Sequence, residues 1–203
     1  METNLLVDAI DLWQKGGALM IPLALLALFI YFTAFELYFR FSVGNYLKVK
    51  LDTLNEWVRD RSKAKGEIGE ILEFTNEGTG TVDELSTRYA EVRSAHLARV
   101  DRRIVFLSIL VSVAPLMGLL GTVMGMLATF EGLTKNVGRT IDLIAAGISE
   151  ALITTQTGLV IAIPGYILIF IIIRRRNRLE TVITRLESMS MQEMERTKGR
   201  ATA

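Results

Sequence analysis

One uncharged stretch, residues 151–173, ends abruptly at three consecutive arginines, Arg174, Arg175 and Arg176. About 20 apolar residues cross a bilayer as a helix, and basic residues gather where such a helix leaves the membrane. At the other end of the stretch stands a single carboxylate, Glu150. An ionisable side chain in a spanning segment is costly, and it is therefore a candidate for an ion or proton path. The stretch predicts a membrane span organised around one glutamate.

Two further uncharged stretches, residues 16–35 and 104–130, are long enough to span a bilayer. Half of the 203 residues are hydrophobic, and three such stretches are not expected in a soluble domain. The only basic residue before the first stretch is Lys15, so we expect a retained span and not a cleaved signal. The sequence predicts an all-α membrane protein with three transmembrane helices.

The second and third spans are expected to continue as long helices outside the membrane. The run Thr81-Val-Asp-Glu84 reads as a capping box, and nothing interrupts the helical pattern between it and residue 130. After Arg176, apolar residues recur at helical spacing, which predicts an amphipathic extension of the third span. Another amphipathic helix is predicted from Leu47 to Val58, a polar turn over residues 131–146, and a frayed end over residues 196–203.

The distribution of basic residues predicts how the chain crosses the membrane. Residues 40–103 carry 12 lysines and arginines and the tail from residue 174 carries 8, against 1 before residue 18 and 2 in the turn. The positive-inside rule then places the N-terminus outside and both long polar segments in the cytoplasm. Arginines are expected at the membrane interface, namely Arg40, Arg102, Arg103, Arg174, Arg175 and Arg176.

Four segments follow from this layout. They are residues 1–41 with an outer segment and the first span, 42–103 with a cytoplasmic helical region, 104–173 with the second and third spans, and 174–203 with a cytoplasmic helix. Small residues four apart in the second span favour close helix packing, and prolines within spans are tolerated where neighbouring helices satisfy the backbone. We expect the second span to pack on protein and to leave little surface for lipid. The predicted packing residues are Pro115, Gly118, Gly121, Gly125 and Pro164.

The hydroxyls after Glu150 form the rest of the candidate path. On an ideal helix Thr154 and Thr157 lie within about 40° of Glu150, whereas Thr155 lies about 140° away and points toward a neighbouring helix. A carboxylate with hydroxyls beside it can take up a proton and pass it on. The alternative interpretation is that Glu150 lies at the level of the outer headgroups.

Several functional classes are excluded by composition. The chain has no cysteine and one histidine, which removes thiolate chemistry and a multi-histidine metal centre within one chain. No nucleophile–base pair or metal-ligand cluster is visible, so we expect neither an enzyme nor a cofactor. The mixed signs in the polar middle region do not indicate a nucleic-acid surface.

Two stretches resemble the MotA/TolQ/ExbB proton-channel family. They are Ala-Pro-Leu-Met-Gly-Leu-Leu-Gly-Thr-Val-Met-Gly over residues 114–125 and Gly-Ile-Ser-Glu-Ala-Leu-Ile-Thr-Thr over 147–155, followed by Gly-Leu-Val-Ile-Ala-Ile-Pro over 158–164. The resemblance implies that Glu150, Thr155 and Thr122 line a proton pathway. The three-span layout is similar to the ExbB and TolQ branches, and Gln156-Thr157 departs from the small or apolar residues usual there.

The resemblance also implies partners and a location. A pentamer of this chain would surround the spans of two ExbD-like or TolR-like partners in a bacterial inner membrane, in contact with lipid. The output would reach a TonB-like or TolA-like protein, so that the protein is a motor subunit for TonB-dependent uptake or, alternatively, for the Tol system. A structural scaffold, in which the glutamate only fixes helix register, stays as a different hypothesis.

Overall fold

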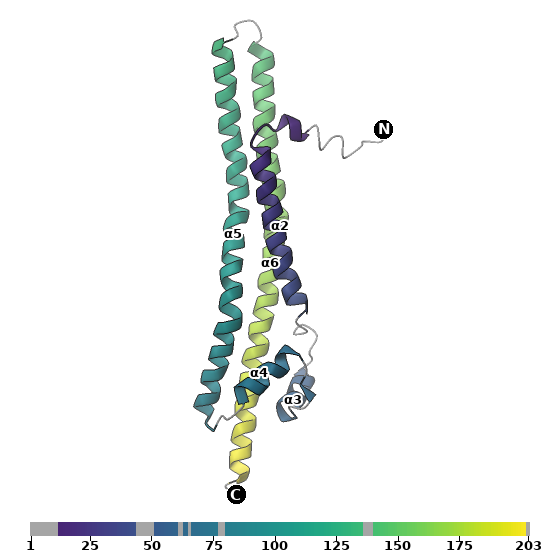
Figure 1. The fold of residues 1–203 in the computed structure, drawn as a ribbon, viewed down its shortest axis with the longest axis vertical. Helices are drawn as coiled ribbons and strands as arrows, with labels where there is room; N and C mark the ends of the chain where they lie inside the picture. Colours follow the sequence, from purple (N-terminus) through teal and green to yellow (C-terminus); the bar gives the residue numbers. More distant parts are fainter. Residues whose placement is uncertain are drawn as a thin grey trace, which may run out of the picture. The chain divides into compact units, whose positions relative to one another are not determined.

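The computed structural model describes residues 12–43, 51–60, 63–64, 66–76, 80–135 and 140–201. The helices of these residues, in chain order, are α2 (Met20–Val43), α3 (Leu51–Arg59), α4 (Glu67–Asn76), α5 (Val82–Lys135) and α6 (Thr140–Ala201) (Figure 1). One further helical turn covers residues 12–15, and the described residues contain no β-strand. Helices α2, α5 and α6 each contain a stretch long and apolar enough to cross a membrane. The prediction of an all-α membrane protein with three spans is confirmed.

The helices of the second and third spans are much longer than a bilayer is thick. Helix α5 has 54 residues and α6 has 62. At 1.5 Å per residue these helices are about 80 and 90 Å long, whereas the hydrocarbon core measures about 30 Å. Both helices therefore extend outside the membrane, as predicted, and they continue through Pro115 and Pro164 without ending.

Two predictions of local structure were wrong, and one helix was not predicted. The polar turn over residues 131–146 is shorter, because α5 continues to Lys135 and α6 begins at Thr140. The predicted fraying from residue 196 is not seen in the described residues, since α6 continues to Ala201. In both places polar and charged residues were taken as signs of irregular structure, although Glu, Lys, Arg and Gln are good helix formers. Helix α4 was not predicted.

The polar region before α5 contains two short helices. An amphipathic helix was predicted from Leu47 to Val58, and the structure has α3 over the second part of this range. Helix α3 buries Leu54 and Val58, whereas Leu47 lies outside the described residues. Helix α4 follows Gly66, whose φ of 68° is in the left-handed region that favours glycine. This helix buries one face, formed by Ile68, Ile71, Leu72 and Thr75.

The predicted capping box opens α5. The backbone N–H of Glu84 donates to Thr81 Oγ1 at 3.2 Å, and the Glu84 carboxylate accepts from the N–H of Thr81 at 3.3 Å and of Gly80 at 2.9 Å. These bonds satisfy backbone donors that the first turn of a helix leaves without partners. A purely local sequence signal therefore determines where α5 begins.

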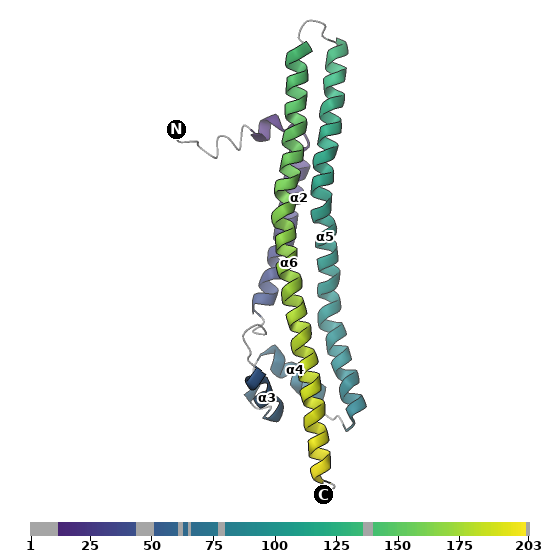
Figure 2. The ribbon, with the colours of Figure 1, turned by 180° about the vertical axis from the view of Figure 1, so that it is seen from behind.

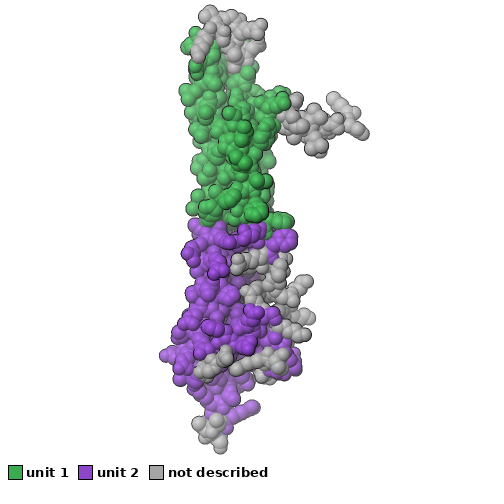
Figure 3. All heavy atoms as spheres, in the orientation of Figure 1, with its two compact units in different colours: residues 1–35, 106–169 green, residues 36–105, 170–203 purple. Residues whose placement is uncertain are grey.

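The chain divides into two compact units (Figure 3). Unit 1 contains Met1–Phe35 and Phe106–Ile169, and unit 2 contains Glu36–Val105 and Phe170–Ala203. The division of the sequence into four segments stays a prediction.

In unit 1, α5 and α6 run side by side along a seam of small residues (Figures 1 and 2). On α5 this seam contains Val111, Ala114, Gly118, Gly121, Gly125 and Thr129, and on α6 it contains Gly147, Ala151, Thr154, Gly158 and Gly165. Neighbouring positions in the seam of α5 are three or four residues apart, which keeps them on one helix face. Without large side chains between them, the two backbones come into direct contact.

Helix α2 completes unit 1. It buries Leu23, Ile30 and Ala34 on one side, and the Tyr31 hydroxyl donates to the carbonyl of Ile161 on α6 at 3.0 Å. The Phe29 ring meets the Phe106 ring of α5 edge to face, with centroids 6.2 Å apart. The first span is therefore attached to both other helices of the unit.

The second span has a large exposed apolar surface in the single chain. In the single chain one face of α5 packs in the seam, and large apolar side chains elsewhere on it are exposed, among them Ile109, Leu116, Leu119, Leu120, Val123, Met124, Leu127 and Phe130. Within one chain these side chains are left uncovered, and the expectation that the second span packs on protein with little surface for lipid stays a prediction. Such an apolar surface suits a lipid or protein environment.

In unit 2 the contact between α5 and α6 is made by large residues. Leu85, Tyr89, Val92, Leu97 and Val100 on α5 and Ile172, Leu179, Ile183 and Leu186 on α6 are buried. The buried Tyr89 hydroxyl is hydrogen-bonded to Ser190 at 2.9 Å, and Arg93 forms an ion pair with Glu187. These two polar contacts join α5 to α6 within unit 2.

Candidate proton-conducting site

Glu150 lies on α6 in unit 1, half-buried, where the helix faces the start of α2. Its carboxylate rests against Gly17, so closely that a Cβ at position 17 would overlap the Oε1 atom. The nearby Gly16 lies against Ile153, one turn further along α6. The carboxylate therefore contacts the turn that precedes α2 and is partly shielded from solvent.

Thr154 and Thr155 both face α5. Thr154 is buried and its hydroxyl donates to the carbonyl of Ala151 at 2.9 Å, with Gly118 O at 3.5 Å. The Thr155 hydroxyl donates to the carbonyl of Gly118 at 3.0 Å. The sequence-based expectation that Thr155 points toward a neighbouring helix agrees with this geometry. That helix belongs to the same chain.

The other two predicted threonines bond within their own helices. The Thr157 hydroxyl donates to Ile153 O at 2.8 Å, and the Thr122 hydroxyl donates to Leu119 O at 2.7 Å. Helical carbonyls are the default acceptors for a threonine hydroxyl in a dry environment. Both hydroxyls are therefore bonded along their own helices, and no hydrogen bond joins Thr122 to Thr155 in the described residues.

The glycines of the second span allow the backbones to meet. A Cβ at Gly118 would lie 2.9 Å from the carbonyl oxygen of Thr154, and one at Gly121 would overlap the Thr154 hydroxyl. At Gly125 it would lie 3.2 Å from the carbonyl oxygen of Gly147. All three predicted packing glycines therefore lie in the α5–α6 seam.

Sequence reasoning missed the small residues on the opposite side of the seam. A Cβ at Gly158 would lie 2.6 Å from Ala114 O, and one at Gly147 would overlap the buried Thr129 hydroxyl. The recurrence of small residues on α6 at positions 147, 151, 154, 158 and 165 was a usable signal, because this spacing marks one helix face. Gly17 had no such signal, since its role depends on a distant residue.

The two prolines have different surroundings. Pro115 is half-buried and Pro164 is exposed. A proline within a helix cannot donate to the carbonyl four residues earlier and crowds that turn. The Tyr31 hydroxyl bonds to the carbonyl of Ile161 in the turn before Pro164, which is the kind of support that neighbouring helices give to a broken ladder in membranes.

Most of the predicted interface arginines with described side chains have partners within unit 2. Arg103 forms an ion pair with Glu36, and Arg102 Nε donates to Ala98 O at 3.4 Å. The Arg175 guanidinium lies 3.9 Å from the centre of the Tyr38 ring. Arg174 is exposed, and the side chain of Arg40 lies outside the described residues.

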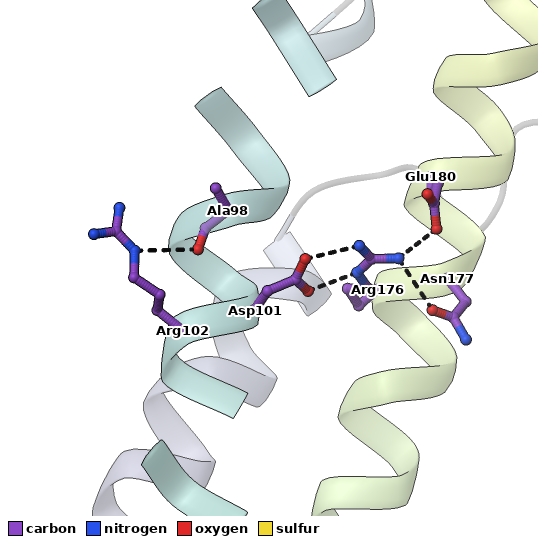
Figure 4. Close-up of polar contacts among 6 residues, drawn as sticks. All are labelled: Ala98, Asp101, Arg102, Arg176, Asn177 and Glu180. Atoms are coloured by element: carbon purple, nitrogen blue, oxygen red, sulfur yellow. Dashed lines mark hydrogen bonds and ion pairs between the residues drawn. The ribbon is translucent and has the colours of Figure 1, made fainter. Parts of the chain in front are cut away.

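Arg176 makes the most extensive set of contacts (Figure 4). Its Nε and Nη2 atoms donate to the two carboxylate oxygens of Asp101 on α5 at 2.7 and 2.8 Å. Its Nη1 atom pairs with Glu180 and donates to Asn177 Oδ1 at 3.3 Å. A two-pronged arginine–carboxylate pair fixes orientation as well as distance, so this contact sets the register between α5 and α6 in unit 2.

The chemistry available at the site is acid–base chemistry of one carboxylate. No group of three or more potential ligands that could hold a metal ion is found in the residues that the structure describes. Glu150 can bind and release a proton, and the threonine hydroxyls next to it on α6 can both donate and accept hydrogen bonds. The arrangement can therefore hold a proton within a spanning bundle.

Comparison with known proteins gives consistent matches. A family model described as the MotA/TolQ/ExbB proton channel family matches residues 65–187. The ExbB-like 1 biopolymer transport protein of Synechocystis is 34% identical over 170 residues, which cover 76% of this chain and 66% of that protein. The Tol-Pal system protein TolQ of Haemophilus influenzae is 42% identical over 66 residues, covering 32% of this chain and 29% of that protein.

A third similar protein is named ExbB. The biopolymer transport protein ExbB of Pseudomonas putida is 33% identical over 94 residues, covering 46% of this chain and 29% of that protein. The chain thus spans just under two thirds of the Synechocystis relative, and less than a third of the other two.

Proposed function

Because the chain belongs to the MotA/TolQ/ExbB proton channel family, we propose that it is an ExbB-like motor subunit of a bacterial inner membrane. In this proposal it works with an ExbD-like single-span partner and uses the proton-motive force to energise TonB-dependent outer-membrane transport. Proton flow through the assembly supplies the energy, and no enzymatic reaction is involved.

The observation that carries the proposal is the position of Glu150. It is a half-buried carboxylate on a spanning helix, held against the first span at Gly17 and adjacent to the close-packed seam of α5 and α6. Carboxylates at such positions are expensive and mark proton relays in membrane proteins. The proposed role of Glu150 is to accept a proton from one side and release it to the other.

The threonines are proposed to extend this path. Thr154 and Thr155 face the second span from α6, Thr157 lies about two turns beyond Glu150 on α6, and Thr122 lies on the second span itself. The bond from Thr155 to Gly118 shows that such a hydroxyl reaches the second span of its own chain. In an assembled ring Thr122 would be available to a neighbouring copy, which stays a prediction.

The assembly and its orientation are part of the proposal. The unequal distribution of lysines and arginines supports an outer N-terminus and cytoplasmic polar segments. The exposed apolar side chains of α5 and α6 in unit 1 offer surface for other copies, the partner spans and lipid. We propose a pentamer around a partner dimer, as the family resemblance implies.

The energy scale favours repeated proton transfer. One elementary charge crossing 100 mV releases about 2.3 kcal/mol. That is enough to bias one step of a rotating assembly, but it is small against the work of pulling a large partner open. Several protons per output event are therefore expected, which suits a cyclic motor better than a single switch.

A direct test measures proton flux through the assembled complex. The complex is purified through a tag on this chain, placed in vesicles with a trapped pH-sensitive dye, and given a pH gradient. Wild type should conduct and Glu150→Gln should not, because glutamine has a similar shape and cannot bind and release a proton. The Glu150→Gln complex must be recovered in normal amount and composition. If it conducts like wild type, the glutamate is structural and the proposal is wrong.

A growth test separates the branches. Wild type, a deletion strain and Glu150→Gln are grown on a ferric siderophore as the only iron source. Failure of both the deletion and Glu150→Gln supports the uptake role. If all three strains grow and no second copy of the system compensates, the similarity to TolQ gives the alternative, a Tol-like subunit in contact with a TolA-like protein. That alternative is tested by the integrity of the outer membrane.

A further inference from the structure

Gly17 has a conformation that few other residues adopt. Its φ is 69°, in the left-handed region where an ordinary side chain is strained. The residue lies in the turn between the helical turn at 12–15 and α2. This turn is closed by hydrogen bonds from Gly16 N to Leu12 O at 3.0 Å and from Met20 N to Gly17 O at 3.2 Å.

The space of the missing side chain at position 17 is occupied by Glu150. A Cβ there would overlap Oε1 and would lie 2.6 Å from Cδ and 3.3 Å from Cγ of the glutamate. The contact is therefore with the whole end of the side chain and not with a single atom. Because the Glu150 side chain is packed on backbone, its range of positions is restricted.

The turn also has the electrostatic character that suits a carboxylate. The N-terminal end of a helix carries a partial positive charge, because its peptide dipoles are aligned along the helix axis. Met20 is the first residue of α2, three residues after Gly17. The carboxylate thus lies beside the end of the first span that favours negative charge.

We infer that Gly17 is a positioning residue for the proton-carrying carboxylate of Glu150. It acts by the absence of a side chain, which lets the turn before α2 close directly onto the carboxylate and hold it in one place. This inference rests on the proposed proton path, and it gives the first span a direct part in that path. Any side chain at position 17 displaces the carboxylate from the place where it receives or releases its proton.

The test is proton flux in vesicles with the complex purified through the tagged full-length chain. Gly17→Ala should lower the flux per complex at least about tenfold, because a displacement of the order of 1 Å at a reacting group has effects of this size. Gly66→Ala is the matched control, since Gly66 has nearly the same φ of 68° but nothing within 4 Å of an added Cβ. It introduces the same backbone strain without the collision and should conduct like wild type.

A rescue experiment distinguishes positioning from a general structural role. Glu150→Asp shortens the side chain by one methylene, so that no atom of residue 150 extends to the place of Oε1, where the overlap with a Cβ at position 17 is most severe. In this background, adding Gly17→Ala should lower the flux by less than about threefold, although it lowers wild-type flux at least about tenfold. A merely structural effect of Gly17→Ala would lower the flux by the same factor in both backgrounds, and that result would overturn the inference.

The possible failures can be told apart. If Glu150→Gln conducts normally, the proposed function falls whatever Gly17 does. If Glu150→Gln abolishes flux and Gly17→Ala leaves it at the wild-type level, only the positioning role falls. Should Gly17→Ala give too little complex, Gly17→Asn repeats the test, because asparagine tolerates the left-handed conformation but still collides with the carboxylate. Normal flux in that variant would also overturn the inference.

Discussion

The hydroxyl of Thr155 donates a hydrogen bond to the backbone carbonyl of Gly118 at 3.0 Å. The bond joins α6 to α5 at the level where neither helix has a large side chain in the seam. A carbonyl in the middle of a helix is normally screened by side chains of its neighbours, so the bond requires that residue 118 be glycine. The close approach of the helices and the placement of the candidate proton-path hydroxyl are thus consequences of the same residue.

Gly118→Ala should destabilise the complex by about 1–3 kcal/mol, the usual cost of overpacking. The added Cβ would lie 2.9 Å from Thr154 O and 3.0 Å from Thr155 Cα, and both are backbone atoms that cannot rotate away. We expect denaturant-induced unfolding in detergent to have a lower midpoint, with unfolding measured as the loss of the helical circular-dichroism signal. Gly199→Ala is the control, because nothing lies within 4 Å of a Cβ at that position in α6. Equal midpoints for both variants would show that the seam is not tightly packed.

Local and compositional signals were sufficient for the three spanning helices of this chain, but not for α4. The three spans follow from long uncharged stretches, and the start of α5 follows from Thr81 and Glu84, which are three residues apart. The chemistry that decides these features is contained in a short window of sequence. The wrong predictions, at residues 131–146 and 196–203, arose because charge alone does not end a helix.

The site was predictable only as a list of residues. The sequence pattern identified Glu150, Thr154 and Thr157 as candidates, and the family resemblance implied Thr155 and Thr122, but the contact of Glu150 with Gly17 joins residues far apart in the chain. The same is true of Asp101 with Arg176, which were each visible as charged residues near a span without any sign of the pairing. Contacts of this kind depend on how helices are rotated against each other, which spacing on one helix does not determine.

Tyr31→Phe should lower the stability of unit 1 by about 0.5–1.5 kcal/mol, the usual contribution of one hydrogen bond. The variant removes the hydroxyl that donates to Ile161 O. This carbonyl lies in the turn before Pro164, which has no backbone N–H to donate to that turn. We expect faster amide hydrogen exchange around residues 161–165 in detergent-solubilised complex. Phe32→Leu alters an exposed neighbour on the same helix and should leave this exchange unchanged. Unchanged exchange in Tyr31→Phe would mean that the hydroxyl does not support the turn.

Asp101 and Arg176 are expected to be energetically coupled by about 1 kcal/mol in a double-mutant cycle. The arginine side chain is 19% exposed and the aspartate 44%, so solvent weakens the pair without abolishing it. The cycle uses Asp101→Asn, Arg176→Gln and the double variant, with denaturant unfolding as the measurement. Arg176→Lys should recover little of the loss, because an ammonium group cannot reproduce the two parallel hydrogen bonds. Additive effects of the single variants would show that the pair contributes nothing to the α5–α6 contact.

Acid should loosen the start of α5 through Glu84. Hydrogen bonds from the backbone N–H of Gly80 and of Thr81 hold the pKa of this carboxyl below its ordinary value. A group whose pKa is lower in the folded state contributes stability above its unfolded pKa of about 4.3, and that contribution is lost as the pH falls through the folded value. Amide exchange over residues 82–87, corrected for its intrinsic pH dependence, should therefore show reduced protection at pH 3 relative to pH 7. Glu84→Gln is the matched control, because glutamine also serves at this position of a capping box but does not titrate. In Glu84→Gln the exchange protection of residues 82–87 should be the same at pH 3 and pH 7. If this protection falls at pH 3 as much as in wild type, a group other than Glu84 is responsible.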